Sequence, residues 1–310
     1  MPSKPPALIA LCLLAGLIGT RSSPAQAQQQ NAATLEDEGV KRLLQSARAG
    51  EVHAQFELGL MYETGESVGQ DNAEAVKWYQ EAGSHGEANA QFRLGLMFAE
   101  GRGVERDDAK AASWLRKAAE QGHAEAQYAV GLAYALGRGV AHDESQAYDW
   151  YKKAAEQGLP PAQFELGRIY QDGKGITQNF SQAVHWFGKA ADQGEPNAQY
   201  ELGVMFHNGE GVRQDDTEAV TWYGRAAEQG HVAAQFSLGL SFRDGHGVPR
   251  NDVEAYMWLD LAARRSLSDS DRTTYANARD MLAKAMTTDQ IAEGQKRVQW
   301  WLEGFQRRHR

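Results

Sequence analysis

Apolar side chains recur three and four positions apart in short stretches along most of the chain, a spacing that predicts amphipathic helices. The first stretch carries Ala54, Leu58 and Tyr62, and Gly65 follows it. A glycine just past the last turn commonly ends a helix, because it accepts the left-handed conformation found there. The pattern therefore predicts a helix that starts near Ala54 and ends before Gly65.

A second amphipathic stretch follows after a short loop. Asp71 begins it, and a carboxylate at that place can accept hydrogen bonds from the free backbone N–H groups of a first turn. Ala75, Trp78 and Ala82 then form an apolar stripe, and Gly86 ends the segment. The two stretches together predict a pair of antiparallel helices joined by a loop.

The helix pair returns six times with a period of 36 residues. The alanine of an Ala-Gln dipeptide marks each copy: Ala54, Ala90, Ala126, Ala162, Ala198 and Ala234. A tryptophan follows each alanine after 24 residues: Trp78, Trp114, Trp150, Trp186, Trp222 and Trp258. Its constant place within the apolar stripe predicts that this tryptophan is buried. Similar helix pairs in tandem stack into a solenoid, because each unit covers its apolar face only against its neighbours.

The two ends of the chain depart from the period, as the end units of a repeat array do. We expect an N-terminal capping helix over residues 34–53, six repeats over 54–266, and two C-terminal capping helices with a basic tail over 267–310. The last predicted helix contains Trp300 and Trp301, which cannot both lie on one face of a helix. We expect them to dock in the cap, and a second binding surface is the open alternative.

Three short patterns give the repeat its spelling: Ala-Gln-aromatic-x-Leu-Gly, then Gly-x-Gly-Val, then Ala-x-x-Trp-Tyr-x-x-Ala-Ala-Glu-Gln-Gly. This spelling resembles the Sel1-like repeat, a relative of the tetratricopeptide repeat, over about residues 54–265. The resemblance implies an all-α fold, a right-handed α-solenoid of six helix-turn-helix repeats. It also implies an adaptor or scaffold that binds a protein or peptide partner. Exported bacterial members of this family regulate envelope signalling, surface polysaccharide and host interaction.

The N-terminus has the pattern of an export signal. Lys4 supplies a positive charge, and residues 7–18 are twelve small or apolar residues, far fewer than the roughly 20 that span a bilayer. Small residues then precede Gln28 at the two positions that a signal peptidase reads. We therefore expect residues 1–27 to be a cleaved signal peptide, residues 28–33 to be a disordered lead, and the mature protein to be periplasmic or secreted.

Charge and cysteine content narrow the possible partners and cofactors. The net charge is −9, and removal of Lys4 and Arg21 with the signal leaves −11, which repels nucleic acid and anionic lipid. Cys12 is the only cysteine and lies within the signal. The penicillin-related activity linked to a cysteine-rich subgroup of Sel1-like repeat proteins is therefore not carried over. We expect a monomer with no metal, no cofactor, no nucleic-acid partner and no membrane span after signal cleavage.

The sequence offers little that favours catalysis. Loops such as Gly101-Arg102-Gly103-Val104 follow a helix and lack the Lys-Ser/Thr of a phosphate-binding loop, so we interpret them as turns. No His-Glu-x-x-His and no Ser-x-x-Lys occurs. We expect no catalytic residues and no enzyme, and the alternative left open is an envelope hydrolase that acts on cell-wall material.

The six copies differ mainly along one face of their first helix. A rotation of about 100° per residue gathers the variable columns of residues 57, 60, 61 and 64 on one side, away from the constant ones. In repeats of this kind the first helix lines the concave side, where an extended peptide or a helix can bind. The predicted partner-binding residues are Glu57, Met61, Arg93, Met97, Glu100, Leu136, Glu165, Arg168, Asp172, Glu201, Met205, Asn208 and Asp244.

The methionines of this face favour a binding surface, since exposed methionine is common where a surface adapts to its partners. The alternative interpretation is that these columns vary only because they are exposed to solvent, where substitutions cost little stability.

Overall fold

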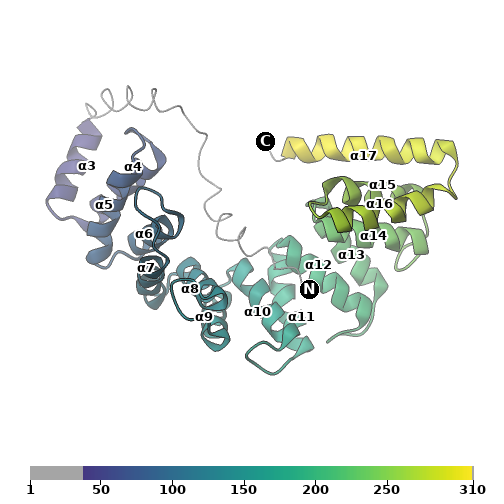
Figure 1. Ribbon diagram of the computed structural model, residues 1–310, viewed down its shortest axis with the longest axis horizontal. Coiled ribbons are helices and arrows are strands. Elements are labelled where there is room, and N and C mark those ends of the chain that lie inside the picture. The colour runs from purple at the N-terminus through teal and green to yellow at the C-terminus, as the bar shows by residue number, and fades with distance from the viewer. Residues whose placement is uncertain (1–37, 309–310) are drawn as a thin grey trace. The chain divides into compact units, whose positions relative to one another are not determined.

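The computed structural model describes residues 38–308, and all the regular secondary structure in that range is helical (Figure 1). The predicted signal peptide, the lead and the first residues of the N-terminal capping helix lie outside the described residues, as do His309 and Arg310. The helices are α3 Glu38–Arg48, α4 Val52–Thr64, α5 Asn72–Ser84, α6 Ala88–Glu100, α7 Asp108–Glu120, α8 Ala124–Leu136, α9 Glu144–Glu156, α10 Pro160–Asp172, α11 Phe180–Asp192, α12 Pro196–Asn208, α13 Asp216–Glu228, α14 Val232–Asp244, α15 Asp252–Arg265, α16 Asp269–Ala283 and α17 Thr288–Arg308.

The helices form two compact units that divide after Gln157. Each repeat consists of a first helix, here called the A-helix (α4, α6, α8, α10, α12 or α14), and a second, the B-helix (α5, α7, α9, α11, α13 or α15). The first unit holds α3 and three repeats, and the second holds three repeats with α16 and α17. The predicted α-solenoid with N- and C-terminal capping helices is confirmed.

The predicted helix ends are confirmed. Each A-helix stops at a glycine in the left-handed conformation, with φ between 64° and 77°, from Gly65 to Gly245. Each B-helix begins after an Asp or Asn whose side chain accepts one or two backbone N–H groups of the first turn. The capping residues are Asp71, Asp107, Asp143, Asn179, Asp215 and Asn251.

A glycine in each A-helix lets the two helices of a repeat approach closely. A Cβ atom added at Gly131 would lie 2.7 Å from the Tyr151 ring, and one added at Gly167 would lie 2.6 Å from the Phe187 ring. Real Cβ atoms do not approach so closely, so only glycine fits while the bulky residue of the B-helix keeps its place. This contact fixes the spacing of the helices within each repeat.

The glutamine of the Ala-Gln dipeptide joins three successive helices. In five repeats its Nε2 donates to a carbonyl eight residues earlier. In four repeats its Oε1 accepts the Nε2 of a glutamine thirty residues later. At Gln127 the two distances are 3.1 Å to the Ala119 oxygen and 2.7 Å to Gln157. The side chain is 5% exposed, so each of these hydrogen bonds replaces one that water can no longer make.

The hydrogen-bonded glutamines stop at both ends of the array. His85 stands where the later glutamine would contact Gln55, and Arg265 stands where it would contact Gln235. The Oε1 atoms of Gln55 and Gln235 are accordingly buried without a hydrogen-bond partner. The network therefore marks which repeats are internal.

The tryptophan column is more varied than predicted. Trp150, Trp186 and Trp258 are buried, whereas the other three are only half-buried. Trp150 packs on α7 and α8 residues of a common apolar cluster, and Lys153 Nζ lies 4.0 Å from its ring centroid. Trp150 of α9 thus packs on the preceding B-helix, α7. In four repeats a Lys or Arg three residues after the tryptophan lies over its ring.

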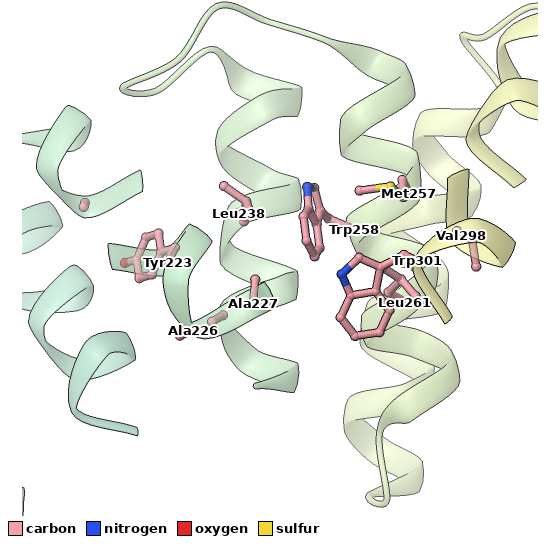
Figure 2. Packing of buried hydrophobic residues seen from close by; sticks show 11 residues of the cluster. Tyr223, Ala226, Ala227, Leu238, Met257, Trp258, Leu261, Val298 and Trp301 are labelled. Carbon is pink, nitrogen blue, oxygen red and sulfur yellow. The ribbon is translucent and has the colours of Figure 1, made fainter. Parts of the chain in front are cut away.

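The C-terminal cap separates the tandem tryptophans as the helical spacing requires. Figure 2 shows Trp301 of α17 beside Trp258 and Leu261 of α15, and the two indole rings meet edge to face at 6.2 Å. Trp300 points away and is 72% exposed. The predicted docking in the cap is therefore correct for Trp301 alone.

We expect Trp150→Ala to lower the free energy of unfolding by about 3–5 kcal/mol, the range for removing a buried aromatic side chain. Trp300→Ala is the matched control and should change stability by less than about 0.5 kcal/mol, since its side chain is exposed. Urea denaturation followed by circular dichroism measures both. Equal midpoints for Trp150→Ala and wild type would show that this tryptophan does not support the array.

Candidate functional site

The predicted face, which we call the A-helix face, consists of the columns of residues 57, 61 and 64 together with Arg168. Its residues differ widely in exposure. Those that are exposed are Glu57, Leu136, Asp172, Asn208 and Asp244, and those that are half-buried are Met61, Arg93, Glu100, Glu165, Arg168 and Glu201. The outer column of residue 64 therefore offers the most accessible side chains.

Met97 and Met205 do not belong to an accessible surface, and the expectation of exposed methionines is wrong for both. Each is fully buried in an apolar cluster with residues of the B-helix that precedes it. The preceding repeat covers this column, which a rotation of one isolated helix cannot show. Met61 is half-buried, and among the described residues α3 is the one helix before its own.

In the first unit, Arg93 and Glu100 belong to an internal ion network. The buried carboxylate of Glu63 accepts from Tyr79 Oη at 2.7 Å and from Arg102 Nη1 at 2.8 Å, and Arg93 lies 3.5 Å away. Arg102 also pairs with Glu100 at 2.5 Å. Burial, and then the negative charge of Glu63, raise the pKa of the Tyr79 phenol. These groups stabilise the junction between the first two repeats.

In the second unit, Glu165 and Glu201 occupy the same place on successive A-helices and are incompletely compensated. Arg168 lies 3.5 Å from Glu165, and Gln171 lies 3.5 Å from Glu201. Burial raises the pKa of both carboxyl groups above their ordinary value, against the opposing effect of Arg168. A cationic group of a binding partner could therefore pair with two carboxylates that are poorly solvated by water.

The more exposed acids of the outer column have partners next to them in sequence. Lys174 Nζ lies 2.6 Å from Asp172, and Arg243 lies 2.7 Å from Asp244. Exposed pairs of this kind contribute little stability, typically about 0–1 kcal/mol, so a partner could replace them at small cost.

Two histidines have a role that the sequence reasoning missed. The Nδ1 atoms of His123 and His231 accept the N–H groups of Ala126 and Ala234 and so cap their A-helices. Both rings contact an aromatic residue of the preceding A-helix: His231 stacks on Tyr200 at 4.8 Å, and His123 is tilted against Phe92 at 4.5 Å. The sequence could have indicated this role, because Glu87 and Glu195, which stand in the same column, also cap their A-helices.

One further motif of the sequence has a structural explanation. Residues 65–69 spell Gly-Glu-Ser-Val-Gly, the pattern of a nucleophile elbow, which requires a strand before the serine and a helix after it. Here the motif follows α4 and forms the turn before α5. Ser67 has φ 64° because it stands where Gly103 and its equivalents stand in later repeats.

Two further properties concern the described residues as a whole. Between Glu38 and Arg308, no three His, Cys, Asp or Glu side chains are grouped so that they could hold a metal ion. None of the helices in this range combines the length and the apolar character that crossing a membrane requires.

The fold and the repeated contacts define an α-solenoid of paired-helix repeats, and comparison with known proteins identifies the class more closely. The chain matches the Sel1 repeat family in six consecutive segments, 52–87, 88–123, 124–159, 160–195, 196–231 and 232–267. These segments cover more than two thirds of the 310 residues, and the chain belongs to the Sel1 repeat family. The family is generally non-enzymatic and its fold is commonly a protein–protein interaction scaffold.

Several solved structures are similar to this chain, and the first of them agrees with this assignment. A Sel1 repeat protein from Oxalobacter formigenes is 26% identical, with a TM-score of 0.63 over 86% of this chain and 100% of that one. A protective antigen of uropathogenic Escherichia coli, described as displaying an SLR fold, is 24% identical, with a TM-score of 0.39 over 96% and 95% of the two chains. An immunity protein from Pseudomonas aeruginosa is 22% identical, with a TM-score of 0.40 over 75% and 82%. The sequence has no match among curated proteins.

The His231 cap predicts a pH dependence of stability. Burial lowers the pKa of His231 to about 4 in the folded protein, below the ordinary value of 6.5. Between these values the unfolded chain holds the proton and the folded chain does not, so the free energy of unfolding falls as the pH drops. This one group contributes at most roughly 3 kcal/mol to the fall.

We expect His231→Asn, which keeps a cap but does not titrate, to reduce the loss of stability between pH 7 and pH 4.5. The exposed His246→Asn is the control and should leave that loss unchanged. Thermal melts across this pH range measure the effect. The same pH dependence in all three proteins would mean that His231 is not held neutral by burial.

Proposed function

We propose that this protein is an exported scaffold or regulator that binds a partner polypeptide on the A-helix face of its units. The observation that carries the proposal is that each A-helix has one set of constant, buried positions and another set of variable positions, most of which solvent can reach. The constant columns of residues 54, 55, 58 and 59 are buried in all six repeats and serve the fold. The columns of residues 57 and 64 vary, and most of their side chains can be reached from solvent.

Glu165 and Glu201 are the strongest candidates for a direct contact. A carboxylate that has lost part of its water gains more from a new cationic partner than a fully solvated one does. Because the two lie on successive A-helices, α10 and α12, a lysine or arginine of a bound peptide could contact either of them. The exposed Asp172 and Asn208, which end the same two helices, would continue this contact outward.

Export rests on the sequence of residues 1–27, with its positive charge, short apolar stretch and small residues before Gln28. Intact-mass measurement of the protein isolated from the periplasm tests this directly. We expect a chain that begins at or near Gln28. A mass that still includes residues 1–27, or protein that stays with membranes after a salt wash, would contradict it.

We expect the double variant Glu165→Arg with Glu201→Arg to fold as wild type and to weaken partner capture about tenfold or more, because two reversed charges repel a cationic partner. Arginine already occupies this column at Arg93, so the fold accepts it. The measurement is quantitative mass spectrometry of proteins retained from a periplasmic extract, with thermal melts of each variant.

The matched control is Asp192→Arg with Glu228→Arg, which makes the same change of net charge at exposed positions on B-helices of the same unit. This control should retain the partner at wild-type strength. Equal capture by both double variants would place the binding site away from the A-helix face. Unfolding of the Glu165 and Glu201 variant alone would mean that these carboxylates serve the fold.

A further inference from the structure

A small pocket opens on the A-helix face of the first unit, between the second and third repeats. Its volume is about 30 Å³, and eight of its ten lining residues are alanine or leucine, among them Ala99, Ala133 and Leu136. One water needs roughly 10–15 Å³, so the pocket can take the end of a single small aliphatic side chain. The two remaining lining residues, Asp108 and Arg138, carry opposite charges.

The preceding junction, between the first and second repeats, shows why this space is free. At the positions 36 residues earlier, Glu63, Tyr79 and Arg93 form the ion network described above, and Met97 fills the core beside them. At the pocket those four positions are occupied by smaller or apolar residues. The replacements are Ala99 for Glu63, Leu115 for Tyr79, Ala129 for Arg93 and Ala133 for Met97.

Arg138 is the one member of the network that remains. Its equivalent, Arg102, is held by two carboxylates, those of Glu63 and Glu100. At the pocket, Ala99 and Leu136 take the places of both acids. The Arg138 side chain is half-buried, and no ion pair or hydrogen bond to it is found within the described residues. The one acid near it is Asp108, whose carboxyl pKa it helps to lower.

Asp108, the acid at the same rim, already forms an ion pair with Arg106. Arg106 binds it with two hydrogen bonds of 3.0 and 2.9 Å. The hydrogen bond from Arg106 is also the main cause that lowers the pKa of the Asp108 carboxyl group. The charge that remains for a ligand is therefore positive, and the pocket is complementary to an apolar group with a carboxylate beside it.

We infer that this pocket anchors the partner polypeptide through a small aliphatic side chain, with a neighbouring acidic residue of the partner bound by Arg138. The inference rests on the proposed function and adds the chemistry of one contact to it. In an extended peptide, residues two positions apart point to the same side. The partner segment therefore carries a valine or a residue of similar size, with Asp or Glu two positions away.

A synthetic peptide tests this chemistry without knowledge of the natural partner. The probe is N-acetyl-Gly-Glu-Ser-Val-Ser-Glu-Gly-amide, titrated into the full-length mature protein carrying ¹³C-labelled alanine and leucine methyl groups. We expect saturable shifts centred on the methyl groups of Ala99, Ala129, Ala133 and Leu136. Peptides with Ser for Val, or with Lys for both Glu residues, should bind about tenfold more weakly or not at all, because each loses one of the two contacts.

Two protein variants separate the two contacts. Ala133→Met restores the residue that fills this column at Met97 and Met205, and it should abolish the saturable shifts with no loss of thermal stability. Arg138→Gln leaves the pocket open, so the Glu peptide and its Gln counterpart should then bind within about twofold of each other, since the charge-assisted contact is gone. Arg138→Gln also keeps the test valid if Ala133→Met lowers stability.

Some outcomes would overturn the inference. They are shifts spread evenly over the protein, binding of the Lys peptide as tight as that of the Glu peptide, or unchanged binding by both variants. These results are independent of the charge reversal at Glu165 and Glu201, which lies in the second unit. If the peptide does not bind but that charge reversal weakens partner capture, binding on the A-helix face is supported and only the pocket proposal is contradicted. If neither experiment shows an effect, both proposals are contradicted.

Discussion

The array depends on one buried amide, the side chain of the glutamine that follows alanine in every repeat. In the second, third and fifth repeats it donates to the end of the preceding B-helix and accepts from a glutamine at the end of the following one, as Gln91 does with Gly83 and Gln121. A buried amide with unmade hydrogen bonds costs about 1–3 kcal/mol, so a shift of one helix against the next is penalised at each such repeat. The glutamine thus sets the register, and close contacts such as that of Gly131 with Tyr151 set the helix spacing.

Because the register is fixed by constant columns, the remaining columns can change without loss of the fold. The first unit shows this at adjacent junctions. One is filled by Glu63 and the three side chains that bind it, and the next has lost those groups and holds a pocket with Arg138 at its rim. In the second unit, the column of Arg93 and Ala129 carries Glu165 and Glu201, whose carboxyl pKa values are raised by burial. Within each unit, the side chains at the repeat junctions therefore differ in charge and size while the backbone arrangement stays the same.

The sequence predicted the helix pairs, their caps and their number because these features depend on local spacing that repeats six times. It failed where a side chain meets the preceding repeat. Met97 and Met205 face outward on an isolated helix but are covered by the B-helix before it. The histidine caps His123 and His231 contact an aromatic ring of the preceding A-helix. The pocket could not be predicted from any one residue, since it results from several small replacements that only the fold brings together.

Photo-crosslinking to the captured partner tests most directly whether the partner binds the A-helix face. A photoreactive phenylalanine is placed at Asp172 or Asn208, the exposed ends of two A-helices, or at His185 or Thr221, exposed positions on B-helices of the same unit. We expect crosslinked partner from the two A-helix positions and none from the two B-helix positions. Crosslinks from His185 or Thr221 alone would show that the partner binds the opposite side of the repeats and would contradict the account.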